Sequence, residues 1–217
     1  MAGLQAAHLE EQLRVESGAS SAMLLGRLGD SVGPPFPPLI PLDPSKLMWV
    51  EQFATKAAYD AHKGGSHLAG FMPLLMPHAA TGSPADFDAL ECEMLHLGRP
   101  HDPQAAAGYA TGVGCARIVG LQVKEESDMP EVIATVRMEI EENMNEPGFI
   151  CGTILLPTPA QPKQMRWLMH WASAEAKAEH AWYPHHRQSR IFTLFPKLDM
   201  SGFGGALEWP AACCIAK

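Results

Sequence analysis

The chain carries the stretch MWVEQFATKAAYDAHKGGSHLAGF at residues 48–71 and a second version of it, RWLMHWASAEAKAEHAWYPHHRQS, at residues 166–189. The two stretches align without a gap at a constant separation of 118 residues, and five positions are identical. The identical pairs are Trp49/Trp167, Ala54/Ala172, Ala58/Ala176, His62/His180 and His67/His185. Because an internal repeat defines the architecture of a chain, the sequence predicts two copies of one module.

Each copy has the pattern of a strand followed by a short helix. The apolar and aromatic runs at residues 47–53 and 165–171 have the composition of strands. Thr55 and Ser173 then stand where a helix N-cap is expected. Glycine or proline interrupts each helix after about two and a half turns. The repeated unit is therefore a strand, a capped helix and a break.

Hydrophobic periodicity predicts the remaining elements. Further strands are expected at 21–28, 87–97, 116–124, 150–156 and 206–215, and helices at 4–16, 66–76, 128–144 and 188–199. Asp128 and Glu131 are expected to form a capping box at the start of their helix. The second copy thus reads β-α-β-β-α-β, a ferredoxin-like unit. The first copy lacks the initial strand, because only three residues precede its first helix.

The modules are expected at residues 1–98 and 109–217, with a linker at 99–108 and a proline-rich insertion at 29–46 in the first module. Proline at this density excludes a helix or a sheet interior, so the insertion is expected to be a surface loop. Aligning Glu16-Ser17-Gly18 with Glu146-Pro147-Gly148 requires a shift of 130 residues instead of 118. The first copy therefore carries 12 additional residues in this loop.

Composition narrows the functional classes. The 217 residues are 47% hydrophobic and 18% charged, with a formal net charge of -8. An acidic chain is not suited to nucleic acid or anionic membranes, and no apolar stretch approaches the roughly 20 residues of a membrane span. The five cysteines lack CxxC spacing, which predicts reduced thiols in the core. We expect a cytoplasmic protein without a nucleic-acid or membrane partner.

Residues 165–171 alternate between two faces of the predicted strand. One face carries only methionine and tryptophan, which is typical of packing under helices, whereas the other carries Arg166, Leu168 and His170. The corresponding face of the first copy carries Met48, Val50 and Gln52. Arg166 and His170 would line an interior cavity, although a strand end near solvent explains them equally well. Any active site is therefore expected in the second copy.

The succession of a strand, Phe or Trp, Ala-Thr or Ala-Ser and a helix ending in His resembles the dimeric α+β barrel superfamily, most closely its antibiotic biosynthesis monooxygenase branch. Glu146-Pro147-Gly148 before a strand fits the same family. The resemblance implies an α+β fold in which two ferredoxin-like modules form an intramolecular dimeric α+β barrel with antiparallel sheets. The edge left by the missing strand would need a cover, either residues 31–46 or a second subunit in a homodimer.

The site residues follow from this resemblance and from the residue chemistry. His170 is the expected general base, and Arg166 is expected to hold the oxyanion that forms. His180, Tyr183 and His185 are further catalytic candidates. A helix-anchoring hydrogen bond is the other expected role for His62 and His180, and a solvated loop explains Tyr183 and His185 equally well. The expected substrate contacts are Gln52, Trp49, Trp167, Trp171 and His62. No metal site is expected, because the histidines lack a ligand pair on one helical face.

The resemblance implies a cofactor-independent enzyme of secondary metabolism that acts on a small aromatic or polyketide-type molecule. A base would remove an acidic proton, and the substrate would then give an electron to O₂, which makes molecular oxygen the expected partner of a monooxygenase. Cyclases, decarboxylases and isomerases use the same deprotonation. A non-catalytic barrel that binds a small ligand and a haem-handling relative are the other hypotheses.

Overall fold

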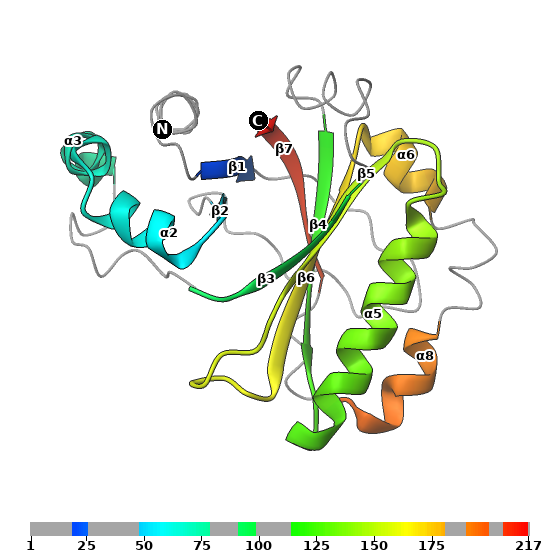
Figure 1. Ribbon diagram of the computed structural model, residues 1–217. Helices are drawn as coiled ribbons and strands as arrows, with labels where there is room; N and C mark the ends of the chain where they lie inside the picture. The colour runs from blue at the N-terminus through cyan, green and yellow to red at the C-terminus, as the bar shows by residue number, and fades with distance from the viewer. Residues whose placement is uncertain are drawn as a thin grey trace.

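The computed structural model describes residues 19–25, 48–78, 91–98, 114–180, 190–199 and 206–216 (Figure 1). Its strands are β1 Ala19–Leu25, β2 Met48–Phe53, β3 Met94–Gly98, β4 Gly114–Gln122, β5 Phe149–Leu155, β6 Gln164–Trp171 and β7 Ala206–Ala216. Its helices are α2 Lys56–Lys63, α3 Ser66–Leu75, α5 Met129–Asn143, α6 Ala174–His180 and α8 Ile191–Leu194, with 3-10 turns η1 Met76–His78, η3 Glu126–Asp128 and η4 Phe195–Lys197. Within these ranges no helix has the length and apolarity that a membrane crossing requires.

The helices of the repeat begin as the sequence predicts. The Thr55 hydroxyl accepts a hydrogen bond from the backbone N–H of Ala58 at 3.1 Å, at the start of α2. The Ser173 hydroxyl accepts one from the N–H of Ala176 at 3.2 Å, at the start of α6. Each hydroxyl satisfies a backbone donor that the first turn of a helix leaves open. Both predicted N-caps are confirmed.

The capping box predicted for α5 is wrong. Asp128 has helical backbone angles, φ −83° and ψ −16°, because the preceding residues already wind into η3, and its side chain makes no capping hydrogen bond. An extended N-cap residue is required for that motif. Lys197 from η4 instead pairs with Asp128 at 3.2 Å and with Glu131. The start of α5 is therefore stabilised by ion pairs with Lys197, which lies far from it in the sequence.

The strand predicted over residues 87–97 is shorter than expected, since residues 91–93 precede β3 without strand geometry. The Glu91 carboxylate accepts a hydrogen bond from the Tyr59 hydroxyl and lies 3.6 Å from Lys63 Nζ. Tyr59 and Lys63 both belong to α2. The approach to β3 is therefore attached to a helix. The predicted helix 4–16, the insertion 29–46 and the linker 99–108 lie outside the described residues.

Seven strands form one antiparallel sheet in the order β2-β1-β7-β4-β6-β5-β3. The run β7-β4-β6-β5 comes from the second half of the chain and has the order of a ferredoxin-like unit. The last strand of each half pairs with a strand of the other half, because β7 lies beside β1 and β3 lies beside β5. The two halves therefore share one sheet, as the predicted α+β fold requires.

The two halves also share one register. Moving β1 by 130 residues and β2 by 118 reproduces the pairing of β5 with β6, including the irregularity near the start of β1 and β5. His96 pairs with Thr153 between β3 and β5. At the equivalent positions, Cys214 pairs with Met23 between β7 and β1. The repeat in the sequence is thus a repeat of strand pairing, and the 12 additional residues lie between β1 and β2.

The sheet curls until its ends approach each other. Gln52 Nε2 on β2 donates to Thr153 Oγ1 on β5 at 3.3 Å, although four strands separate β2 from β5 in the sheet order. In a closed barrel one more strand would stand between β2 and β3, at the position of the initial strand that the first copy is expected to lack. No strand occupies this position among the residues that the structure describes. A cover from residues 31–46 or from a second subunit stays a prediction.

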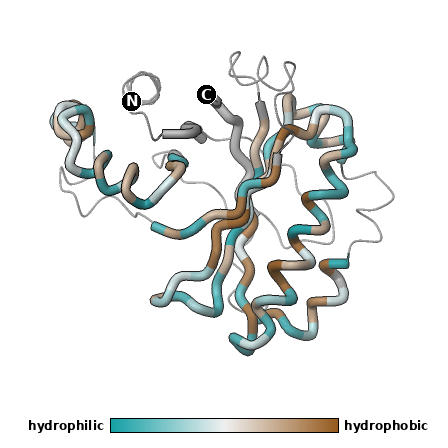
Figure 2. Tube along the Cα trace, viewed as in Figure 1, coloured by the Kyte–Doolittle hydropathy of each residue, from teal (hydrophilic) through white to brown (hydrophobic). Residues whose placement is uncertain are grey.

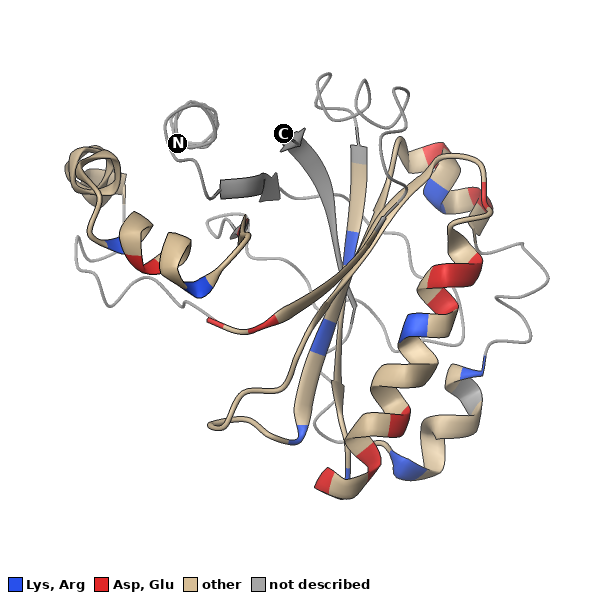
Figure 3. Cartoon of the chain, in the orientation of Figure 1, with Lys and Arg blue, Asp and Glu red and all other residues tan. Residues whose placement is uncertain are grey.

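Helices α5, α6 and α8 cover one face of the second-half strands (Figure 1). Val136 and Ile140 of α5 are fully buried against this face, and Ile133 and Met144 pack at the edge of the same core. Hydrophobic positions follow the strands and recur along α5 (Figure 2). Acidic positions gather along α5, whereas the described strands carry few charges (Figure 3). This amphipathic division explains why α5 lies flat on the sheet.

Candidate functional site

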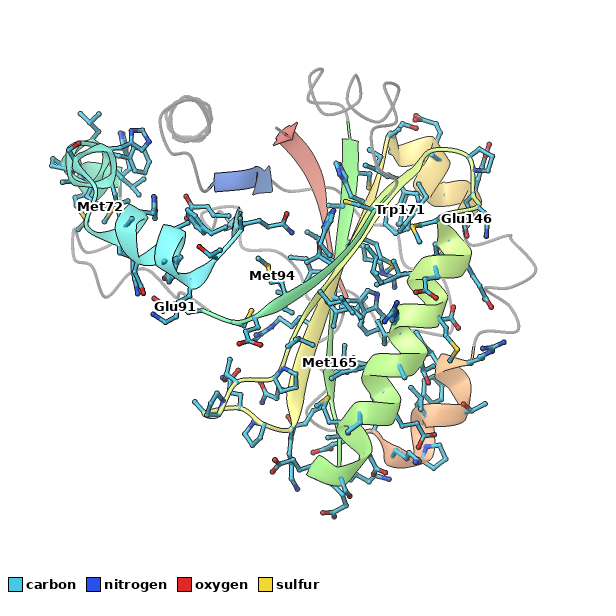
Figure 4. All side chains as sticks on the ribbon, in the orientation of Figure 1. Met72, Glu91, Met94, Glu146, Met165 and Trp171 are labelled. Atoms are coloured by element: carbon cyan, nitrogen blue, oxygen red, sulfur yellow. The ribbon has the colours of Figure 1, made fainter. Side chains whose placement is uncertain are left out.

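The two faces of β6 separate as the alternation predicts. Met165, Trp167, Met169 and Trp171 belong to the core beneath α5. Successive side chains of a strand point to opposite faces, so Arg166, Leu168 and His170 lie on the other face, which we call the inner face. Figure 4 shows Trp171 and Glu146 on the side of α5 and α6, and Met94 of β3 on the opposite side.

Arg166 stands beside open space on the inner face. Its neighbour in the β4–β6 ladder is Gly120, and no described atom lies within 4 Å of the place that a Cβ would take there. By contrast, a Cβ on Gly152, on the helix-covered face, would meet Ile140 Cγ2 at 2.5 Å. Burial raises the pKa of the Cys92 thiol, and the positive charge of Arg166 partly offsets that rise. Arg166 therefore reaches toward the residues that lead into β3.

His170 is on the same face as Arg166 but is fully buried, with 0% of its surface exposed. Its ladder neighbours are Ala116 on β4 and Cys151 on β5, which are both small. Burial disfavours the charged imidazolium and lowers the pKa of His170 to about 4. The ring is thus neutral at pH 7. Such a low pKa also makes it a weak proton acceptor.

Three strands bring a hydrogen-bonded group together on the inner face, which we call the inner polar chain: Gln52, Thr153 and His96. Thr153 is 1% exposed, and its hydroxyl oxygen lies 3.3 Å from Gln52 Nε2 and 2.9 Å from His96 Nδ1. His96 itself is accessible to solvent. The protein atoms around it still desolvate the ring and lower its pKa below the usual value, so His96 is neutral at pH 7.

Sequence reasoning missed His96 and Thr153. His96 stands between two leucines in MLHLG, and Thr153 is the one hydroxyl residue in FICGTIL. A polar residue within an apolar strand was the available signal, because an unpaired polar group on a buried face is costly. The repeated stretch contains other histidines, His62 and His180, and neither His96 nor Thr153 belongs to it. The juxtaposition itself depends on β3 pairing with β5 across the two halves, which the sequence does not reveal.

His180 and His62 do not lie on the inner face. His180 Nδ1 is 2.9 Å from both carboxylate oxygens of Glu146, and both side chains are at most 5% exposed. Its ring packs against Trp171 with centroids 5.2 Å apart. His62 Nε2 lies 3.8 Å from Glu51 Oε2 on β2. These contacts join each helix to its own half, as a helix-anchoring role requires, whereas catalysis by His180 and substrate contact by His62 stay predictions.

The remaining candidates divide into core residues and residues that are not described. Trp167 and Trp171 are 2% and 0% exposed and pack in the core beneath the helices, and their role as substrate contacts stays a prediction. Tyr183, His185 and the side chain of Trp49 lie outside the described residues. Within the described ranges, no three His, Cys, Asp or Glu side chains form a group that could hold a metal ion.

By fold, the protein is an α+β protein whose ferredoxin-like strand order is joined into a curled antiparallel sheet. Two solved structures share this fold with nearly the whole chain. A "putative monooxygenase" from Fusobacterium nucleatum is 12% identical, with 100% of this chain and 86% of its own covered and a TM-score of 0.68. A "putative monooxygenase" from Lactobacillus acidophilus is 16% identical, with 98% and 87% covered and the same TM-score of 0.68.

At these identities the similarity establishes the fold alone. No protein-family model matches the sequence, and a search of curated proteins found no match. The α+β fold with an antiparallel sheet that the sequence predicts is confirmed.

Proposed function

We propose that this protein is a cofactor-independent monooxygenase that binds a flat aromatic or polyketide-type molecule against the inner face of its sheet. The observation that carries the proposal is Arg166 beside Gly120, where no described atom lies within 4 Å of the place that a Cβ would take, on the face that also carries Leu168. Sites for small molecules are mostly apolar with a few fixed polar groups. The two solved structures reported above are each named "putative monooxygenase", which supports the same class.

The guanidinium of Arg166 would bind the oxygen anion of the deprotonated substrate. A phenol or enol that loses its proton carries negative charge on oxygen, and a fixed cation in a site of low polarity stabilises that charge strongly. Arg166 keeps its charge at any working pH. It thereby lowers the pKa of the bound substrate and makes the proton available to a weak base.

His170 would accept this proton. It is four residues from Arg166 on the same strand face and is neutral above about pH 4. Its ring is fully buried beside Ala116 and Cys151, so proton transfer requires the bound substrate to reach it from the inner face. Because its pKa is low, His170 contributes less than a base poised near pH 7, and anion binding by Arg166 provides the larger effect.

The oxygenation balances without a cofactor for a substrate with an acidic methylene between aromatic rings. The carbanion gives an electron to O₂, and the two radicals combine to a hydroperoxide. Loss of water then leaves a carbonyl, so one oxygen atom enters the product and the other leaves as water. The methylene carbon supplies all four electrons that reduce O₂.

The test uses 1,8-dihydroxyanthrone as the probe, with oxygen uptake and quinone absorbance as readouts. We expect turnover by the wild-type protein in the presence of EDTA, a loss of about 10²-fold in kcat for His170→Ala, the low end for a general base, and no change for the exposed His78→Ala. Circular dichroism checks folding. Turnover that survives in His170→Ala but disappears in His62→Ala would move the site to the first half, and a wild-type protein without oxygen uptake would argue for a ligand-binding role.

A further inference from the structure

Among the described residues, His96 has a hydrogen-bond partner on one side of its ring. Thr153 Oγ1 lies 2.9 Å from Nδ1, and within the described residues Nε2 has no hydrogen-bond partner. The ring belongs to the inner face, because His96 pairs with Thr153 and Thr153 contacts Gln52 across the curled sheet. The free nitrogen is therefore available to a ligand on that face.

The buried hydroxyl of Thr153 determines which nitrogen of His96 carries the proton. A hydroxyl donates one hydrogen bond and accepts two, and Gln52 Nε2 already donates to Thr153 Oγ1. At 1% exposure the Thr153 hydroxyl hydrogen needs an acceptor within the protein. Among the described atoms the acceptor within hydrogen-bond distance is His96 Nδ1. Nδ1 must then be unprotonated, and the neutral ring carries its proton on Nε2.

We infer that Gln52 and Thr153 hold His96 in the Nε2–H form, so that His96 donates a hydrogen bond to a carbonyl, enolate or phenolate oxygen of a ligand on the inner face. The inference rests on the proposed function for the identity of that ligand as the substrate. His96 is then a substrate-binding donor, with Thr153 and Gln52 as positioning residues. The lowered pKa of His96 keeps the ring neutral, as a donor of this kind requires.

The repeat does not provide a second set of these residue types at the equivalent positions. In the shared register the position of Gln52 corresponds to His170, that of Thr153 to Met23, and that of His96 to Cys214. Neither methionine nor cysteine provides the hydroxyl and imidazole that the inner polar chain needs. The first half therefore contributes Gln52 and His96 to a site whose Arg166 and Thr153 come from the second half.

The tautomer is measured by ¹⁵N NMR of the histidine side chains in the ligand-free full chain at pH 7. We expect unprotonated Nδ1 and protonated Nε2 for His96 in the wild type and in Thr153→Ser, which keeps the hydroxyl. Thr153→Val and Gln52→Leu should shift His96 toward a mixture of tautomers. Protonated Nδ1 in the wild type, or a Thr153→Val spectrum identical to that of the wild type, would overturn the inference.

The donor role is tested by binding of 1,8-dihydroxyanthraquinone, which is not turned over. His96→Leu should weaken its binding about fivefold, the usual effect of one neutral hydrogen bond, whereas His78→Leu should not. Unchanged binding in His96→Leu would refute the donor role. The tautomer measurement does not depend on turnover, so an inactive protein with the Nε2–H form would contradict the proposed function alone. An active protein with the Nδ1–H form would contradict this inference alone.

Discussion

Arg166→Ala should lower kcat/KM for oxidation of 1,8-dihydroxyanthrone by about 10²–10³-fold, the cost of removing a fixed group that stabilises a developing oxyanion. Arg166 carries its positive charge beside the open space at Gly120. Its removal therefore leaves the substrate anion without its counter-charge on the inner face. Arg166→Lys should recover only part of the rate, since an ammonium lacks the planar fork of a guanidinium.

Arg137→Ala is the matched control for this loss of charge. Arg137 forms an exposed pair with Glu141 at 2.8 Å on α5, on the opposite side of the sheet from the inner face. Its removal changes net charge by the same amount without touching the proposed site. Steady-state kinetics of both variants separate the local effect from the general one. Equal activity of Arg166→Ala and Arg137→Ala would show that the inner face does not bind an anion.

His180→Ala should reduce the free energy of unfolding by about 3–5 kcal/mol, because it leaves the carboxylate of Glu146 buried without its partner. Glu146 is 2% exposed and lies 2.9 Å from His180 Nδ1. The pair joins α6 to the turn before β5, where Gly148 has φ 79° and a Cβ would lie 2.6 Å from Ala176 Cβ. Loss of the pair therefore loosens a closely packed junction.

Chemical denaturation of His180→Ala, Glu146→Gln and the double variant measures this coupling. Glu146→Gln keeps an acceptor for the ring and should cost about 1 kcal/mol, the scale of a neutral hydrogen bond. The exposed pair of Lys56 and Asp60 gives a control, and Lys56→Ala should cost less than about 1 kcal/mol. A His180→Ala cost no larger than that of Lys56→Ala would exclude a structural role for the buried pair.

The sequence predicted the parts of the fold that depend on neighbouring residues. The alternation at residues 165–171 separated Trp167 from Arg166, and Thr55 and Ser173 identified the helix starts, because these features follow from local periodicity and capping. The strand pairing of β1 with β2 repeats that of β5 with β6, as the repeat in the sequence indicates. The capping box at Asp128 failed for an equally local reason, since the residues before it form a 3-10 turn.

The candidate site was harder to predict because it depends on contacts between distant segments. His96 and Thr153 meet only through the pairing of β3 with β5, and Gln52 reaches them only because the sheet curls. The pKa of His170 follows from complete burial, which one strand's sequence does not determine. The alternation within one strand therefore identified Arg166 and His170, whereas the polar residues of the inner face come from four strands.

The central claim is that the inner face binds the substrate, and a crystal structure of the protein with 1,8-dihydroxyanthraquinone tests it most directly. We expect the rings to lie on the inner face above Gly120, with one ligand oxygen within hydrogen-bond distance of the Arg166 guanidinium and another near His96 Nε2. A ligand bound between α5 and the sheet, or on the outer surface without contact to Arg166, would contradict the account.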